Sequence, residues 1–174
     1  MLGITFLCLA LTTGYGVLHD LVTIRISPEY FTIAHPPLIA TDSLTLLAVA
    51  WGVAATWWIG APLGLTLGLA ATTGPRPRAT ATALAPSLVS ALGLTAGFAA
   101  LAGMLGFLAA TSGFIHVVGP LASRLTPDGQ VRFIAVLWTH LSSYAAGGVL
   151  ALVVVVRTWR ERGRGPAVEA TPAL

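Results

Sequence analysis

The sequence predicts an all-α integral membrane protein, a bundle of four transmembrane helices with both termini in the cytoplasm. Of its 174 residues, 56% are hydrophobic and only 9% are charged, whereas an ordinary soluble domain carries about 25% charged residues. Several uncharged tracts reach the roughly 20 residues that span a bilayer. We therefore expect a multi-pass protein of a bacterial inner membrane, folded as a single domain over residues 1–163 with the lipid bilayer around it.

The four helices are expected at about residues 2–24, 43–73, 80–116 and 131–156. The second tract is longer than one span requires and contains Pro62, so we expect it to tilt or kink. The third tract is kept as one helix, because dividing it would place the arginine-rich tail on the opposite side of the membrane from Arg76 and Arg78. Residues 164–174 are predicted to form a disordered tail.

A short extra helix is expected in the loop that follows the first span. Ser27, Pro28 and Glu29 are residue types preferred at a helix N-cap, at its first position and in its first turn. This helix should stop before Pro36 and Pro37, because proline interrupts a helix.

The arginines set the expected orientation. The chain has nine arginines, no lysine and a net charge of +3. Four spans place six arginines on one side and three on the other, and the positive-inside rule assigns the richer side to the cytoplasm. The two sets are Arg76, Arg78, Arg157, Arg160, Arg162 and Arg164, and Arg25, Arg124 and Arg132. Charge gathered in one short loop and the tail indicates membrane orientation and not a nucleic-acid partner.

Polar residues form one stripe on the first helix and another on the fourth. Their spacings of one, three or four residues place the members of each stripe on one helix face. The first stripe is Thr12, Tyr15, Gly16, His19, Asp20 and Thr23, and the second is Arg132, Val136, His140, Ser143, Tyr144 and Gly147. Polar groups inside a membrane are costly unless paired, so we expect both stripes to face inward, in the outer half of the bundle.

This pattern suggests a metal centre near the periplasmic face. All four histidines fall on that side in the predicted topology, together with acidic residues of the first helix and its loop. Histidine and carboxylate ligands suit zinc or non-haem iron. The candidate ligands are His19, Asp20, Glu29, His35, His116 and His140.

Other interpretations of the same cluster stay open. His19 and Asp20 are also explained as partners of an arginine, with His140 bonded to a tyrosine, which would stabilise the bundle without any ligand. His19 and His140 would suit the two axial positions of a haem, which implies electron transfer. Neither an HExxH nor a CxxC motif is present, and no nucleophile with oxyanion donors is identified, so the sequence leaves open whether the protein is an enzyme.

Glycine-rich helices favour close helix association, as Gly93 and Gly97 illustrate with their four-residue spacing. They are typical of a non-catalytic subunit or scaffold, in a homo-oligomer or a larger membrane complex.

The junction of the first helix and its loop resembles a signature of small bacterial polytopic membrane proteins. The matching runs are YGxxHDxxT from Tyr15 and PEYFT from Pro28. No activity is attached to that group, so the resemblance implies a membrane protein with a distinctive junction, and not its chemistry. Where the group tends to have glutamine after the His-Asp pair, this chain has Leu21.

Overall fold

The structure, a computed structural model, describes residues 1–36 and 38–164 and consists of helices and their connections, without a strand in these ranges. Four helices are long and apolar enough to cross a membrane: α1 (Leu2–Ile26), α3 (Leu44–Thr72), α4 (Ala81–Thr111) and α5 (Pro127–Glu161). Three short helices accompany them: α2 (Pro28–Thr32), η1 (Gly119–Arg124) and η2 (Arg162–Arg164). The predicted all-α bundle of four membrane-spanning helices is confirmed.

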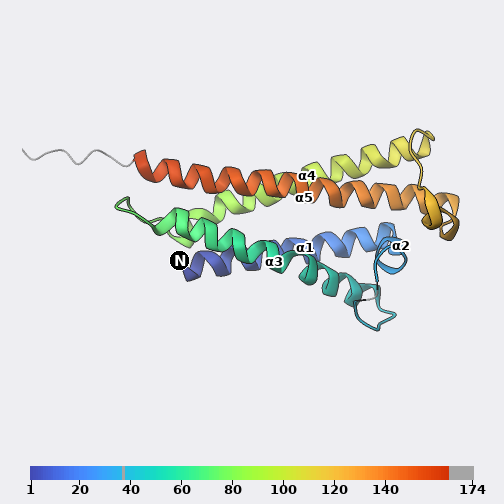
Figure 1. Cartoon of the computed structure of the whole chain (residues 1–174), viewed down its shortest axis with the longest axis horizontal. Helices are drawn as coiled ribbons and strands as arrows, with labels where there is room; N and C mark the ends of the chain where they lie inside the picture. The colour runs from blue at the N-terminus through green and yellow to red at the C-terminus, as the bar shows by residue number, and fades with distance from the viewer. Residues whose placement is uncertain (37, 165–174) are drawn as a thin grey trace, which may run out of the picture.

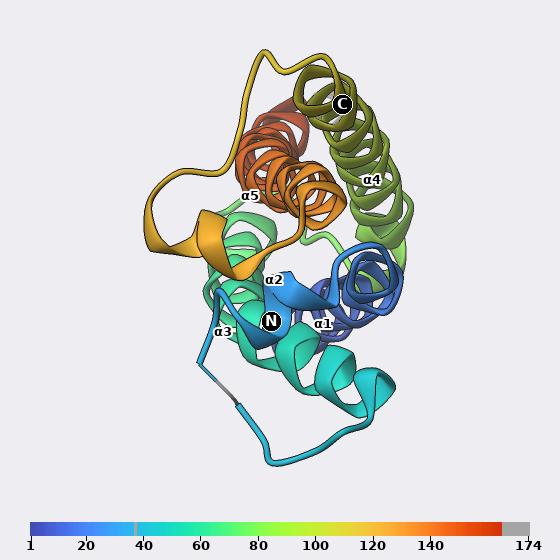
Figure 2. The ribbon, with the colours of Figure 1, turned by 90° about the vertical axis from the view of Figure 1, so that its right-hand side faces the viewer.

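The four long helices form two pairs that lie side by side (Figure 1). The most extensive contacts join α1 to α3 and α4 to α5, whereas the contacts between the two pairs are sparser. Each pair consists of two spans that follow one another in the chain. Viewed along the bundle, α2 lies across one end of it (Figure 2), where it contacts α1, α3 and α5. We call this the α2 end, and we call the opposite end, with the α3–α4 loop and Arg162, the arginine end.

The third span ends earlier than the sequence suggested. α4 stops at Thr111, and Gly113 then adopts a positive φ of 75°, a conformation that ordinary side chains rarely take. The chain leaves the helix there, and His116 lies in the loop instead of ending the helix.

The fourth span is longer than expected at both ends. It begins at Pro127, where the hydroxyl of Thr126 accepts a hydrogen bond from the N–H of Gly129 and caps the helix. It continues to Glu161, so the first arginines after residue 156 are helical. Of the predicted disordered tail, residues 165–174 lie outside the described residues.

The short helix α2 begins as its sequence predicted, with Ser27 as the N-cap and Pro28 as the first helical residue. The Ser27 hydroxyl, however, does not cap the backbone. It donates a hydrogen bond of 2.8 Å to the Glu29 carboxylate.

Glycines of α3 allow that helix to lie directly against α1. A Cβ atom on Gly52 would lie 2.5 Å from the Cα of Val17, and one on Gly64 would lie 2.6 Å from the Cα of Thr5. Gly93 and Gly97 of α4, whose spacing suggested helix packing, have no atom within 4 Å of a Cβ built on them. Close helix approach in the described part of the chain therefore depends on the glycines of α3, and in α4 on Gly103 and Gly106, which meet Thr139 and Trp138 of α5.

Large apolar side chains cover the outside of the bundle. Leu18, Trp57, Trp58 and Leu152 are each more than half exposed, although they lie in the middle or outer parts of long helices. Such exposure is expected where lipid and not water surrounds the helices. The fold and its surface together define a multi-pass helical membrane protein.

At the arginine end, Arg162 is buried and ties the two helix pairs together. Its guanidinium donates to the carbonyls of Ala70 and Thr73, the last turn of α3 and the residue after it, and to those of Arg76 and Pro77 in the α3–α4 loop. The last carbonyls of a helix have no partner within the helix. Arg162 supplies partners for them from the far end of α5.

Candidate functional site

Two histidines and an aspartate of different helices meet in the α2 half of the bundle. His19 and Asp20 come from α1 and His140 comes from α5, and one ligand atom of each lies within 4.8 Å of the other two. Asp20 and His140 are buried, and His19 is partly buried. They meet because the polar stripes of α1 and α5 face each other, as their spacing predicted.

The contact between His140 and Asp20 needs a cation or a proton between its two atoms. Nε2 of His140 lies 3.2 Å from Oδ1 of Asp20, and Nδ1 lies 2.9 Å from the carbonyl oxygen of Val136. A carbonyl only accepts hydrogen bonds, so the Nδ1 hydrogen is donated to Val136. A neutral His140 then offers a lone pair at Nε2, which faces the lone pairs of the carboxylate.

His19 has one nitrogen in a polar network and one without a partner. Nδ1 lies 3.4 Å from the hydroxyl of Tyr15 and 3.5 Å from that of Ser143, and these two hydroxyls are 2.8 Å apart. Nε2 is buried and has no hydrogen-bond partner among the described residues. A buried polar atom without a partner is rare and calls for an explanation such as an ion, a water or a ligand.

Aromatic side chains of α2 cover the cluster. The Tyr30 ring stacks on the His140 ring with centroids 4.5 Å apart, and the Phe31 ring meets it edge-on at 5.8 Å. Burial, with smaller contributions from nearby Tyr144 and Asp20, raises the pKa of Tyr30 to about 12, so its phenol stays neutral. Nothing in the sequence pattern indicated that Tyr30 would stack on His140.

The other predicted ligands lie apart from this group. Nδ1 of His35 donates to the carbonyl of Tyr30 at 2.6 Å, the Glu29 carboxylate accepts from Ser27, and His116 is exposed in the loop after α4. The structure does not bring these three together with His19, Asp20 and His140, and as metal ligands they stay predictions.

The interpretation in which an arginine pairs with His19 and Asp20 is not supported by the position of Arg25. Arg25 donates to the carbonyl of Leu21 and to the hydroxyl of Thr45, and the partner of Asp20 is His140. The polar cluster therefore has no arginine among its hydrogen-bond partners in the described residues.

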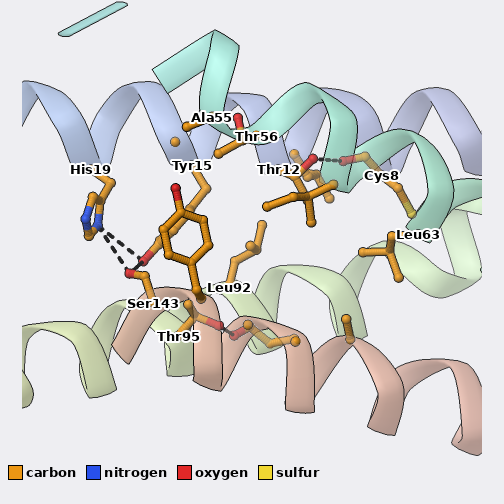
Figure 3. Close-up of a pocket in the computed structure, with 18 of the residues that line it drawn as sticks. Cys8, Thr12, Tyr15, His19, Ala55, Thr56, Leu63, Leu92, Thr95 and Ser143 are labelled. Carbon is orange, nitrogen blue, oxygen red and sulfur yellow. Dashed lines mark hydrogen bonds between the residues drawn. The ribbon is translucent and has the colours of Figure 1, made fainter. Parts of the chain in front are cut away.

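A cavity of about 170 Å³ continues inward from the cluster, between the two helix pairs. Figure 3 shows Tyr15, His19 and Ser143 at one end and Cys8 and Leu63 at the other. Apart from the cluster and a few hydroxyls, its walls are apolar. Polar groups at one end and hydrocarbon along the rest are typical of a site for an amphipathic molecule.

Comparison with protein-family models, curated proteins and solved structures finds no match for this chain. The fold and the cluster thus define its class, a multi-pass helical membrane protein with a buried His/Asp cluster.

Proposed function

We propose that this protein binds one transition metal ion, zinc or ferrous iron, through His19, Asp20 and His140. The observation that carries the proposal is the 3.2 Å contact between two metal-ligand atoms, Nε2 of His140 and Oδ1 of Asp20, which both present lone pairs when His140 is neutral. Two ligands about 2.1 Å from a tetrahedral zinc ion stand about 3.4 Å apart, close to that separation. A cation between them removes the repulsion and uses both atoms.

Two further features support a metal ion. Histidine ligands of metals usually donate their second ring N–H to a carbonyl or carboxylate, and His140 donates its own to Val136. His19 supplies a third ligand: its Nε2 lacks a partner, and one ligand atom of each of the three residues lies within 4.8 Å of the other two. Two histidines and one carboxylate leave at least one coordination position open, as catalytic zinc and non-haem iron sites do.

The geometry disfavours a bis-histidine haem. Axial histidines stand on opposite faces of the porphyrin, whereas the rings of His19 and His140 have centroids only 4.6 Å apart at an angle of 87°. No macrocycle fits between rings that are in contact. The absence of a Soret band from the purified protein is the expected result.

Elemental analysis of detergent-purified protein tests the metal proposal. We expect about one zinc or iron per chain, and at least a 100-fold lower affinity in His19→Ala and His140→Ala, since losing a group that only hydrogen-bonds a metal ligand already costs about 10- to 100-fold. His116→Ala, which removes an exposed histidine on the same side of the bundle, is the matched control and should retain the metal.

Wild-type protein without stoichiometric metal, or a double variant His19→Ala/His140→Ala that retains it, would show that the cluster is structural. In that case Asp20 and His140 share a proton. The double variant Asp20→Leu/His140→Leu would then be close to wild type in its free energy of unfolding, because both buried polar partners are removed together.

The orientation forms part of the proposal, with the α2 end in the periplasm and the arginine end in the cytoplasm. The excess of arginines at the arginine end supports this orientation. Reporter fusions after Pro75 and after Pro127 should give cytoplasmic and periplasmic signals, respectively. Equal signals from both would contradict it.

A further inference from the structure

The His19–Asp20–His140 cluster is covered on the side that faces α2. Tyr30 stacks on His140, Phe31 is only 3% exposed, and α2 lies across this end of the bundle (Figure 2). His35 adds to this cover, with Trp51 5.2 Å from its ring and a hydrogen bond to the carbonyl of Tyr30. A water-soluble substrate arriving from this end would have to displace α2.

The same cluster is open toward the interior of the bundle. His19, Asp20 and His140 all line the cavity, whose wall along α5 extends from His140 to Val154. At about 1.5 Å per residue this stretch is about 21 Å long. A volume of about 170 Å³ over that length describes a narrow slot.

Small residues create the slot. Ala91 of α4 and Gly147, Gly148 and Ala151 of α5 line it, where larger side chains would fill the space. A Cβ on Gly147 would lie 3.7 Å from Thr95, and one on Gly148 would have nothing within 4 Å. The slot lies between the helix pairs, where contacts are sparser than within each pair.

We infer that the slot binds a single-chain lipid, with an oxygen-bearing head group at the His19–Asp20–His140 cluster and its aliphatic chain directed toward Cys8 and Val154. Lipid is the solvent around the bundle, so such a molecule reaches the slot from the bilayer. A cavity of about 150 Å³ holds one benzene ring, so the slot has room for part of one chain and not for the two chains of a phospholipid. The head group belongs at the polar end of the slot, where His19, Asp20 and His140 line its wall and leave a coordination position open.

The head group completes the proposed metal site, and to that extent this inference rests on the proposed function. A carboxylate, hydroxyl or carbonyl oxygen suits an open position on zinc or iron. Binding of the chain depends on the apolar walls and is measurable without the metal.

Photolabelling with a palmitic acid that carries a diazirine in mid-chain tests the inference. Purified wild-type protein should be labelled, and mass spectrometry should place the label on slot residues such as Leu88, Leu92 and Val154. Unlabelled palmitic acid in excess should abolish this label. Label confined to lipid-facing residues such as Leu152, which is 63% exposed and lies outside the slot, would overturn the inference.

Cavity-filling variants give a second, independent test of whether the lipid chain occupies the slot. Ala151→Phe and Ala91→Phe place a ring in the slot from α5 and from α4, and each should reduce slot labelling at least tenfold. The matched controls Ala145→Phe and Ala100→Phe add the same ring at exposed positions outside the slot and should leave labelling unchanged. Undiminished labelling in both slot variants would contradict the inference.

Metal content separates the failure of this inference from that of the proposed function. A slot variant that keeps its metal and loses the label supports both proposals. Protein that holds metal but is never labelled in the slot refutes the lipid and leaves the metal site in place. Protein that is labelled in the slot but contains no metal refutes the metal site alone.

Discussion

Each end of the bundle buries an ionisable side chain, Arg162 at one end and Asp20 at the other, and the two differ in how their hydrogen-bonding capacity is satisfied. At the arginine end, the guanidinium of Arg162 donates to four backbone carbonyls. At the α2 end, Nε2 of His19 has no partner among the described residues, and His140 and Asp20 face each other with lone pairs. Cavities lie beside both groups: one is lined by His19 and His140, and a separate one is lined by Pro77, Arg157 and Arg162.

The difference separates a structural role from a binding role. Arg162 uses most of its five donors within the protein, so its burial is explained without a ligand. The His19–Asp20–His140 cluster has more acceptor capacity than its neighbours satisfy, and the missing partner is a cation or a proton. Burial alone would not have distinguished the two sites.

The largest effect on stability is expected at the arginine end. Arg162→Met removes the donors to the last carbonyls of α3 and should lower the free energy of unfolding by about 2–3 kcal/mol, since a hydrogen bond to a charged group contributes about 1.5–3 kcal/mol and water replaces part of the loss. Denaturation in micelles measures this change.

Arg157→Met is the control near the end of α5, because Arg157 is exposed and, among the described residues, forms its ion pair only with the exposed Glu161. It should change the free energy of unfolding by no more than about 0.5 kcal/mol. If Arg162→Met also removed the bound metal from folded protein, the two ends would be coupled and the comparison would fail.

A smaller effect is expected from Tyr15→Phe, which removes the hydroxyl beside Nδ1 of His19. Loss of this contact to the proposed ligand His19 should weaken metal binding about tenfold, as measured by competition with a chelator of known affinity. Tyr144→Phe removes another hydroxyl near the cavity that has no hydrogen bond to a histidine in the described structure, and its affinity should match wild type. Equal affinities for all three proteins would assign Tyr15 to packing alone.

The smallest effect is expected at the aromatic cover. Tyr30→Leu loses the stacking on His140, which is worth about 1 kcal/mol, and should speed the release of metal to a chelator several-fold. Tyr30→Phe keeps the ring and should release metal at the wild-type rate, because the neutral phenol does not act as a ligand. If Tyr30→Leu released metal no faster than wild type, α2 would not control the access of the chelator to the cluster.

Helical periodicity predicted most of the cluster from the sequence. Residues at these spacings share one face of any straight helix. Tyr15, His19 and Asp20 therefore share a face of α1, and His140 and Ser143 share a face of α5, as predicted. The four spans and the start of α2 follow from hydropathy and from the residue types at Ser27 and Pro28.

Residues outside regular helices were beyond such reasoning. The position of Glu29 depends on how the short α2 folds back over the bundle, that of His35 depends on the loop after α2, and that of His116 depends on where α4 ends, which Gly113 decides. The role of Arg162 was missed because its charge was interpreted only as an orientation signal. Spacing alone does not tell which face of a helix meets its neighbour, so it did not separate Gly52, which meets α1, from Gly93, which has no neighbour within 4 Å.

The pairing of consecutive spans has a consequence for how the protein is made. α1 and α3 emerge from the ribosome one after the other, so their glycine-lined contact forms before α4 and α5 exist. The second pair then assembles in the same way, and the slot closes when the two pairs meet. Because Arg162 follows α5, its hydrogen bonds to the α3–α4 loop can form only after all four long helices have been synthesised.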